Sequence, residues 1–201
     1  MAVESVCGKL LNGQDQTCIT VKRRYFQQAV VINRTDIDLS TVEYQLTDFE
    51  SPTPTCEYGV KFELKVGKTG YRFAGLEAGS SYSGTFDKTR SDLGYPQYTH
   101  NANMIVMGAS EEAKCVLSSL DKGSYVVAFQ FQDGTVEIYG MENGLSTGDY
   151  TYDIQGGGGG SLIVLSSLET APENNLPLVY VSQIPGQESE DFDDAFANSG
   201  S

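Results

Sequence analysis

Tryptophan is absent from this 201-residue sequence, histidine occurs once, and the four cysteines are scattered. Cys7, Cys18, Cys56 and Cys115 form no C-x-x-C pair, so the ligand spacing of a zinc site is missing. The single histidine, His100, stands in a polar run with no serine in a nucleophile-elbow setting, and a catalytic base needs a positioned partner. We therefore expect no enzymatic activity, no metal and no cofactor, with His100 in a packing or surface role and the thiols free or buried.

Long apolar runs are also missing: none approaches the roughly 20 residues that a membrane-spanning helix requires. The opening residues Met1 to Ser5 have neither the basic start nor the apolar core of a secretory signal. We therefore expect no membrane partner and assembly in the cytoplasm. A composition of 39% hydrophobic and 20% charged residues is that of a globular chain. Its length predicts a single β-rich domain over residues 1–186, with a core that needs no disulfides.

Basic residues become scarce after residue 75. Residues 1–75 carry nine basic and nine acidic side chains, residues 76–186 carry four against thirteen, and residues 187–201 add five acids and no base. Such a chain gains little counterion-release energy on phosphate backbones, so specific DNA binding is not expected. The acidity either keeps the protein soluble or forms a surface past which DNA slides. The last stretch, 187–201, predicts an acidic, disordered tail.

The fold class is predicted as mainly β, a β-sandwich or small barrel with one packed helix. Residues 60–66 alternate apolar and polar side chains at the period of a strand. Asp133-Gly134 favours a type I′ hairpin turn, since both central positions of that turn need positive φ. The predicted strands are 25–32, 41–46, 60–66, 82–86, 98–107, 125–131, 135–139, 161–165 and 178–181.

One helix is predicted, over residues 110–120. Ser110 is placed to cap its first turn, where Glu111 and Glu112 favour the helix dipole. An apolar stripe at helical spacing predicts packing against a sheet and leaves Cys115 off the contact line; its members are Ala113, Val116, Leu117 and Leu120.

Two patterns superficially resemble ligand sites. Asp36, Asp38 and Glu43 have a spacing like that of a calcium loop, but Thr41 stands where the required glycine would be. The glycine run 156–160 lacks the Lys-Ser/Thr pair that opens a phosphate-binding helix. We interpret the first as a solvated turn and the second as a loop.

Tyrosine is abundant, with 12 residues. Tyr71, Tyr82, Tyr95 and Tyr98 lie between or beside predicted strands. Tyrosine is enriched at protein interfaces, where its rigid ring provides contact area at a small entropic cost. Aromatic residues are also ordinary strand formers at half-buried positions, and the sequence leaves both interpretations open.

The order of these elements along the chain resembles that of a known protein family. A β meander, the helix at 110–120, the hairpin 125–139, the loop Gly140-Met141-Glu142-Asn143-Gly144-Leu145 and a last apolar strand resemble the tail tube proteins of tailed bacteriophages. In addition, the stretches Cys7-Gly8-Lys9-Leu10, Thr17-Cys18-Ile19 and Arg23-Arg24-Tyr25-Phe26-Gln27-Gln28 resemble virion structural proteins of crAss-like and related gut phages. The similarity covers roughly residues 5–182.

This resemblance implies a virion structural protein of the viral tail, a self-assembling ring subunit, with homohexameric rings stacked into the conduit used in DNA ejection. It also implies other tail or neck proteins as partners, and a lumen that tends to be acidic. A head–tail neck ring or adaptor, a carbohydrate-binding or adhesin β-sandwich and, last, a β-rich hydrolase are the alternatives. Because long loops are often functional, the loops 47–59 and 155–161 supply the candidate subunit-contact residues: Asp48, Phe49, Pro52, Pro54, Gly156, Gly158 and Gly160.

Overall fold

The computed structural model describes residues 28–48, 51, 53, 55–74, 82–131, 133–153 and 159–196. As predicted, the chain is mainly β with one packed α-helix, α1 (Glu111–Leu120). None of the described helices is long and apolar enough to cross a membrane. The strands are β1 (Gln28–Asn33), β2 (Ile37–Leu46), β3 (Tyr58–Leu64), β4 (Tyr71–Ala74), β5 (Ser83–Arg90), β6 (Pro96–Met107), β7 (Tyr125–Gln130), β8 (Val136–Tyr139), β9 (Leu145–Thr147), β10 (Gly160–Ser167) and β11 (Leu178–Tyr180).

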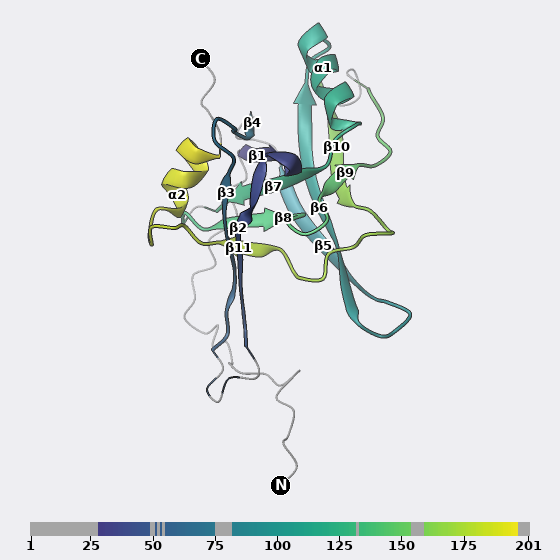
Figure 1. Ribbon diagram of the computed structural model, residues 1–201. Helices are drawn as coiled ribbons and strands as arrows, with labels where there is room; N and C mark the ends of the chain where they lie inside the picture. The colour runs from purple at the N-terminus through teal and green to yellow at the C-terminus, as the bar shows by residue number, and fades with distance from the viewer. Residues whose placement is uncertain are drawn as a thin grey trace, which may run out of the picture.

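The strands form one open sheet in the order β2-β3-β11-β8-β7-β9-β10-β6-β5, and β1 joins it by pairing with β7 and β4. Neighbours are antiparallel except β11 and β3. A single residue pair, Tyr125 with Leu145, links the halves of the sheet. The sheet folds at this link, so β6 and β10 pack over β1 and β7 in a loosely sandwich-like arrangement with free edges rather than a closed barrel (Figure 1).

The strands β1 and β7 are buried on both faces. Val31 and Val127 point into one hydrophobic core, whereas Val30 and Val126 point into a second core on the opposite side. Strands buried on both faces read as continuous apolar runs instead of alternating ones. This accounts for the sequence Tyr-Val-Val-Ala-Phe at the start of β7.

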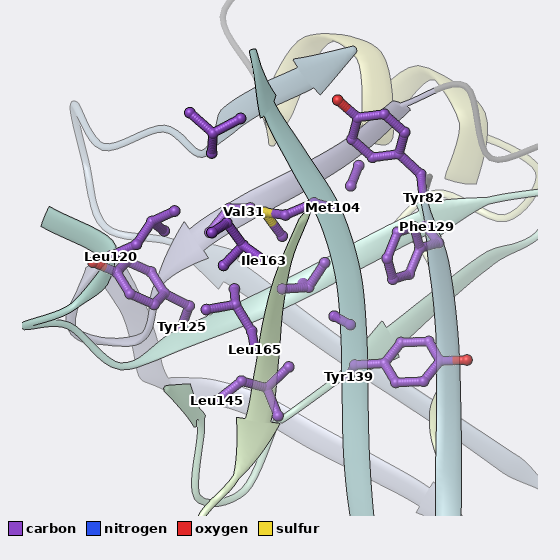
Figure 2. Packing of buried hydrophobic residues seen from close by; sticks show 14 of the residues in the cluster. Val31, Tyr82, Met104, Leu120, Tyr125, Phe129, Tyr139, Leu145, Ile163 and Leu165 are labelled. Carbon is purple, nitrogen blue, oxygen red and sulfur yellow. The ribbon is translucent and has the colours of Figure 1, made fainter. Parts of the chain in front are cut away.

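The first core lies between β1 and β7 on one side and β6, β10 and α1 on the other. On β6, burial alternates, with Ala102, Met104 and Val106 facing the core. Figure 2 shows Met104 close to Ile163 of β10 and Val31 of β1. β6 is therefore a strand with one buried face, although its sequence ends in the continuous apolar run Met104-Ile105-Val106-Met107.

The second core contains the C-terminal segment, which corrects the prediction of a disordered tail for its described part. Residues Glu188–Glu190 (α2) and Asp191–Ala195 (η2) are helical, and Phe192 is fully buried. Phe196 stacks on Phe62 of β3 with the ring centroids 5.1 Å apart. Two aromatic rings thus anchor an acidic segment whose composition alone indicates disorder. Residues 197–201 lie outside the described part.

The helix α1 forms as its sequence predicts. The Ser110 hydroxyl accepts a hydrogen bond from the Ala113 N–H at 3.2 Å, which caps the first turn. Ala113, Leu117 and Leu120 are buried against the sheet, and Cys115 is exposed.

The hairpin of β7 and β8 is confirmed, but its turn type was predicted wrongly. Gly134 has a φ of +87°, whereas none of the described non-glycine residues has positive φ, so Asp133 does not fit a type I′ turn. The Phe131 N–H donates to the Thr135 carbonyl at 2.8 Å, enclosing three residues. This is the other common hairpin connection, in which a glycine in the left-handed region ends a three-residue loop.

Candidate functional site

The single histidine belongs to a buried polar cluster. His100 on β6 is 2% exposed, and its ring packs edge-on against Tyr139 at 5.6 Å between centroids. The Gly140 N–H donates to His100 Nδ1 at 3.2 Å, so Nε2 carries the proton and donates to the Asn175 carbonyl at 2.9 Å. Burial lowers the pKa of His100 to about 4, and the hydrogen bond to Asn175 opposes this shift. His100 is therefore a neutral packing histidine.

A buried carboxylate lies in the same cluster. Glu173 is 1% exposed and accepts hydrogen bonds from the backbone N–H groups of Glu142 and Asn143, each at 2.9 Å. Its own backbone pairs with that of Tyr98 on β6. Burial raises the pKa of Glu173, while the two N–H groups and the nearby Arg34 guanidinium lower it.

Together these contacts join the turn 140–144 to the segment 172–175 and to β6. The Glu142 carboxylate accepts from the Asn174 N–H at 2.8 Å, and Arg34 donates to the Glu142 carbonyl. The His100 ring and the carboxylates of Glu142 and Glu173 are held by hydrogen bonds within the fold, whereas Arg34 Nε is buried without a hydrogen-bond partner among the described residues. These contacts therefore hold the turn 140–144, the segment 172–175 and β6 together.

The acidic residues with calcium-like spacing are engaged locally. Asp36 accepts from the Asn33 side chain at 2.9 Å and lies 3.4 Å from the Lys68 ammonium. Asp38 accepts from the Ser40 N–H and hydroxyl, and these hydrogen bonds lower its pKa. Among the described residues, no three His, Cys, Asp or Glu side chains are grouped to hold a metal ion.

Only two of the seven predicted contact residues fall within the described chain. Asp48 follows β2, and its carbonyl accepts from the Ser51 N–H at 3.4 Å. Gly160 is not in a loop: it opens β10, pairs with Met107 and is buried, which corrects its assignment. The other five lie outside the described residues: Phe49, Pro52, Pro54, Gly156 and Gly158.

Among the described residues, the path of strands from β2 to β5 has an open edge at each end, and the short strand β4 pairs only with β1. Within the described chain, β2 pairs only with β3, and β5 pairs only with β6. β2 is 10 residues long and shifts register between Asp38 and Glu43, so its regularly paired part begins at Glu43. β5 is eight residues long, and its last six residues are exposed. An open edge presents unpaired backbone groups to another strand.

The hairpin of β5 and β6, which we call the β5–β6 arm, extends away from the body on the side opposite α1 (Figure 1). Its tip, residues 91–95, is ordered by backbone hydrogen bonds: Ser91 N–H to the Tyr95 carbonyl at 2.9 Å and Gly94 N–H to the Ser91 carbonyl at 2.8 Å. Gly94 has a φ of +83°, which favours glycine in this tight turn. Two apolar side chains project from this ordered tip: Leu93 is 84% exposed and Tyr95 69%.

At the other end of β6, a groove of about 410 Å³ lies between α1 and β4. We call it the α1–β4 groove. Its floor is apolar, with Phe73, Val116 and Val31, and its polar groups come from Asn33, Glu112 and Ser119. The exposed thiol of Cys115 also lines it, together with Tyr71, Leu120 and Tyr125.

The predicted tyrosine cluster divides in the structure. Tyr71 and Tyr95 are exposed, as an interface role requires, whereas Tyr82 is buried and Tyr98 half-buried. Leu93 escaped sequence analysis; its signal was a large apolar residue inside the turn Asp92-Leu93-Gly94. Glu173 and Glu142 carried no signal, because their partners lie far away in the sequence.

Comparison with models of known protein families, with curated proteins and with solved structures finds no match to this chain. The open edges, the apolar tip and the groove are therefore the features on which a function can be based.

Proposed function

We propose that this protein is a structural subunit that assembles head to tail with copies of itself into a closed ring, as in the tail tube or neck of a bacteriophage virion. The observation that carries the proposal is the pair of open edges, β2 and β5, at opposite ends of one sheet. When one edge of a copy pairs with the other edge of the next copy, the contact is heterologous and produces a ring if the rotation closes.

The charges on the two edges support this pairing. Exposed Glu43 lies on the regular part of β2, with Asp38 just before the bulge. β5 carries Lys88 and Arg90, two of the four basic residues between residues 76 and 186, and one acid, Asp87, so its net charge is +1. An acidic edge and a basic edge attract each other, whereas two identical edges repel, so charge favours the heterologous arrangement.

The resemblance in the order of elements and the net charge of −14 extend the proposal to a DNA conduit. Carboxylates repel the phosphates of passing DNA within a Debye length of about 8–10 Å, so DNA moves through without being held. No reaction is part of this function, which agrees with the full engagement of His100 and Glu173 inside the fold.

Reversing charge on one edge tests the proposal. The wild-type protein is expected to form closed oligomers in sedimentation velocity and negative-stain images. The variant K88E/R90E places acids on both edges, and the fraction in rings should fall at least tenfold, since facing like charges cost several kcal/mol. Adding E43K, which makes the regularly paired part of β2 basic, should restore rings.

The matched control, K114E/K122E, makes the same change of charge on and just after α1, and rings should persist. A wild-type protein that stays monomeric at high concentration, or a K88E/R90E variant that assembles normally, would overturn the edge-to-edge proposal.

A further inference from the structure

The tip of the β5–β6 arm and the α1–β4 groove complement each other in chemistry. The tip presents Leu93, an aliphatic side chain, and Tyr95, an apolar ring with a hydroxyl at its end. The groove offers an apolar floor together with acceptors such as the Glu112 carboxylate. Tyrosine favours sites where its ring is buried and its hydroxyl reaches a polar partner. A volume of about 410 Å³ is in the range of pockets that enclose side chains or small ligands.

These two features cannot meet within one copy. The tip precedes Pro96 at the start of β6, and α1 follows Met107 at its end. A strand of 12 residues spans roughly 40 Å at about 3.3 Å per residue. Figure 1 shows the arm and α1 at opposite ends of the molecule. Any contact between them must therefore join two copies.

We infer that the tip of one copy inserts Leu93 and Tyr95 into the α1–β4 groove of a second copy, so that copies stack along the direction of β6. The inference rests on the proposed ring. Edge pairing joins copies side by side, across the strand direction, whereas the tip contact joins copies one above another, along the strand direction. A tip at one end and a groove at the other form a heterologous contact that does not close by itself, so it propagates. Stacked rings, a tube rather than a single neck ring, are the result.

The contact between tip and groove is small, so we expect it to hold whole rings together rather than pairs of monomers. A buried tyrosine contributes roughly 150–250 Å², far below the ~1,000 Å² of a stable interface. A single tip should therefore hold two monomers only weakly. A ring presents the contact once per subunit, and simultaneous engagement multiplies the overall affinity. The ordered tip adds to this because little conformational freedom is lost on insertion.

The first test is the variant L93S/Y95S. Rings should persist, and the fraction found in stacks by negative-stain imaging should fall at least tenfold. The matched control, L168S/I184S, removes two apolar side chains that are 53% and 59% exposed elsewhere on the surface, and stacks should persist. Unchanged stacking by L93S/Y95S would overturn the inference while leaving the ring intact.

A disulfide test locates the contact. In a chain with C7S, C18S and C56S, Cys115 lines the groove as the one remaining thiol. Adding L93C should give a ladder of crosslinked multimers under mild oxidation. The control V66C, on a fully exposed residue of the β3–β4 turn, should give none, and C115S should abolish the ladder. Absence of the ladder in assembled L93C protein would overturn the inference.

The same chemistry detects the rival occupant, the N-terminal segment of the chain itself. In a chain with C7S and C56S, Cys18 and Cys115 remain. A crosslink between them within one copy would show that the N-terminal segment of the same copy fills the groove, which overturns the inference.

The L93C ladder also separates the tip contact from the ring. If K88E/R90E protein forms no rings but still gives the ladder at high concentration, the tip contact forms without the ring. If the wild type forms rings but L93C gives no ladder, only the tip contact fails.

Discussion

The strands β7 and β5 use their residues in opposite ways. β7 has six residues, five of them buried, and lies between two hydrophobic cores. β5 has eight residues, six of them exposed, and within the described part of the chain one of its edges pairs with no other strand. The side chains of β7 must be apolar for the fold to be stable, whereas most positions of β5 can carry other side chains without loss of stability. An ordered strand that the core does not require is a place to look for contacts with other molecules.

The largest difference in stability between β7 and β5 is expected when one phenylalanine in each strand is replaced by alanine. Phe129→Ala in β7 removes a fully buried ring that packs against Tyr139 and should lower the free energy of unfolding by about 3–5 kcal/mol. Phe86→Ala in β5 removes a ring that is 46% exposed and should cost no more than about 1 kcal/mol. Urea denaturation of both variants, prepared as monomers, measures the difference. Equal losses would show that β5 is part of the stabilising core and break the comparison.

The C-terminal segment should contribute to the stability of the fold as β7 does, despite its acidic composition. Phe192→Ala is expected to lower the free energy of unfolding by about 3 kcal/mol, since the ring is fully buried in the second core. Asp194→Ala, on an exposed residue of the same segment, is the control and should change stability by less than about 0.5 kcal/mol. Thermal unfolding followed by circular dichroism suffices. If Phe192→Ala leaves the stability unchanged, the segment is a disordered tail, as its composition indicates.

Acid should weaken the body through His100. Its pKa is about 4 in the folded protein and 6.5 in the unfolded chain, so the unfolded chain binds more protons between these values. The stabilisation is therefore complete above pH 6.5 and falls by about 2–3 kcal/mol as the pH drops to 4. The raised pKa of Glu173 acts with the opposite sign, since its contribution is lost as the pH rises through its folded value.

Urea midpoints of the wild type and of His100→Gln between pH 4 and 7 isolate this contribution. The wild type should lose more stability than the variant over this range. Identical slopes would show that His100 does not titrate as its burial implies.

The smallest expected effect concerns the cap of α1, which forms one side of the groove. Ser110→Ala removes the hydrogen bond to the Ala113 N–H and should cost about 1 kcal/mol. Ser118→Ala, on an exposed position inside the same helix, is the matched control and should not destabilise the protein, because alanine favours helix interiors. Chemical denaturation distinguishes the two. A larger loss for Ser118→Ala would contradict the capping role.

Local sequence patterns sufficed for the elements in which burial follows a short-range periodicity or a continuous apolar run. The alternation of residues 60–66 in and after β3, the apolar run of β7 and the capped stripe of α1 each predicted their element. Features that depend on distant partners were not predictable. Phe192 lies among acids that indicate disorder, and only its place in the second core, whose other members come mostly from distant parts of the chain, explains its burial. Likewise Glu173 is held by Glu142 and Asn143, thirty residues away.

The candidate site was predictable in part. Tyr95 was noted for its residue type, but only the structure shows that it is exposed on an ordered tip next to Leu93. The Asp133-Gly134 dipeptide predicted a hairpin correctly and its turn type wrongly, because the register of β7 and β8 encloses three residues instead of two. Register is a property of both strands and cannot be read from the turn alone.

The length of β6 has a mechanical consequence. β6 is paired with β5 over eight residue pairs on one side and with β10 over seven on the other. Because the hydrogen bonds between antiparallel strands lie perpendicular to the strands, a pull along β6 that is resisted by β5 and β10 loads these bonds in shear, all at once, instead of unzipping them one after another. A filament strained along this axis would carry its tension through the most strongly anchored strand of each subunit.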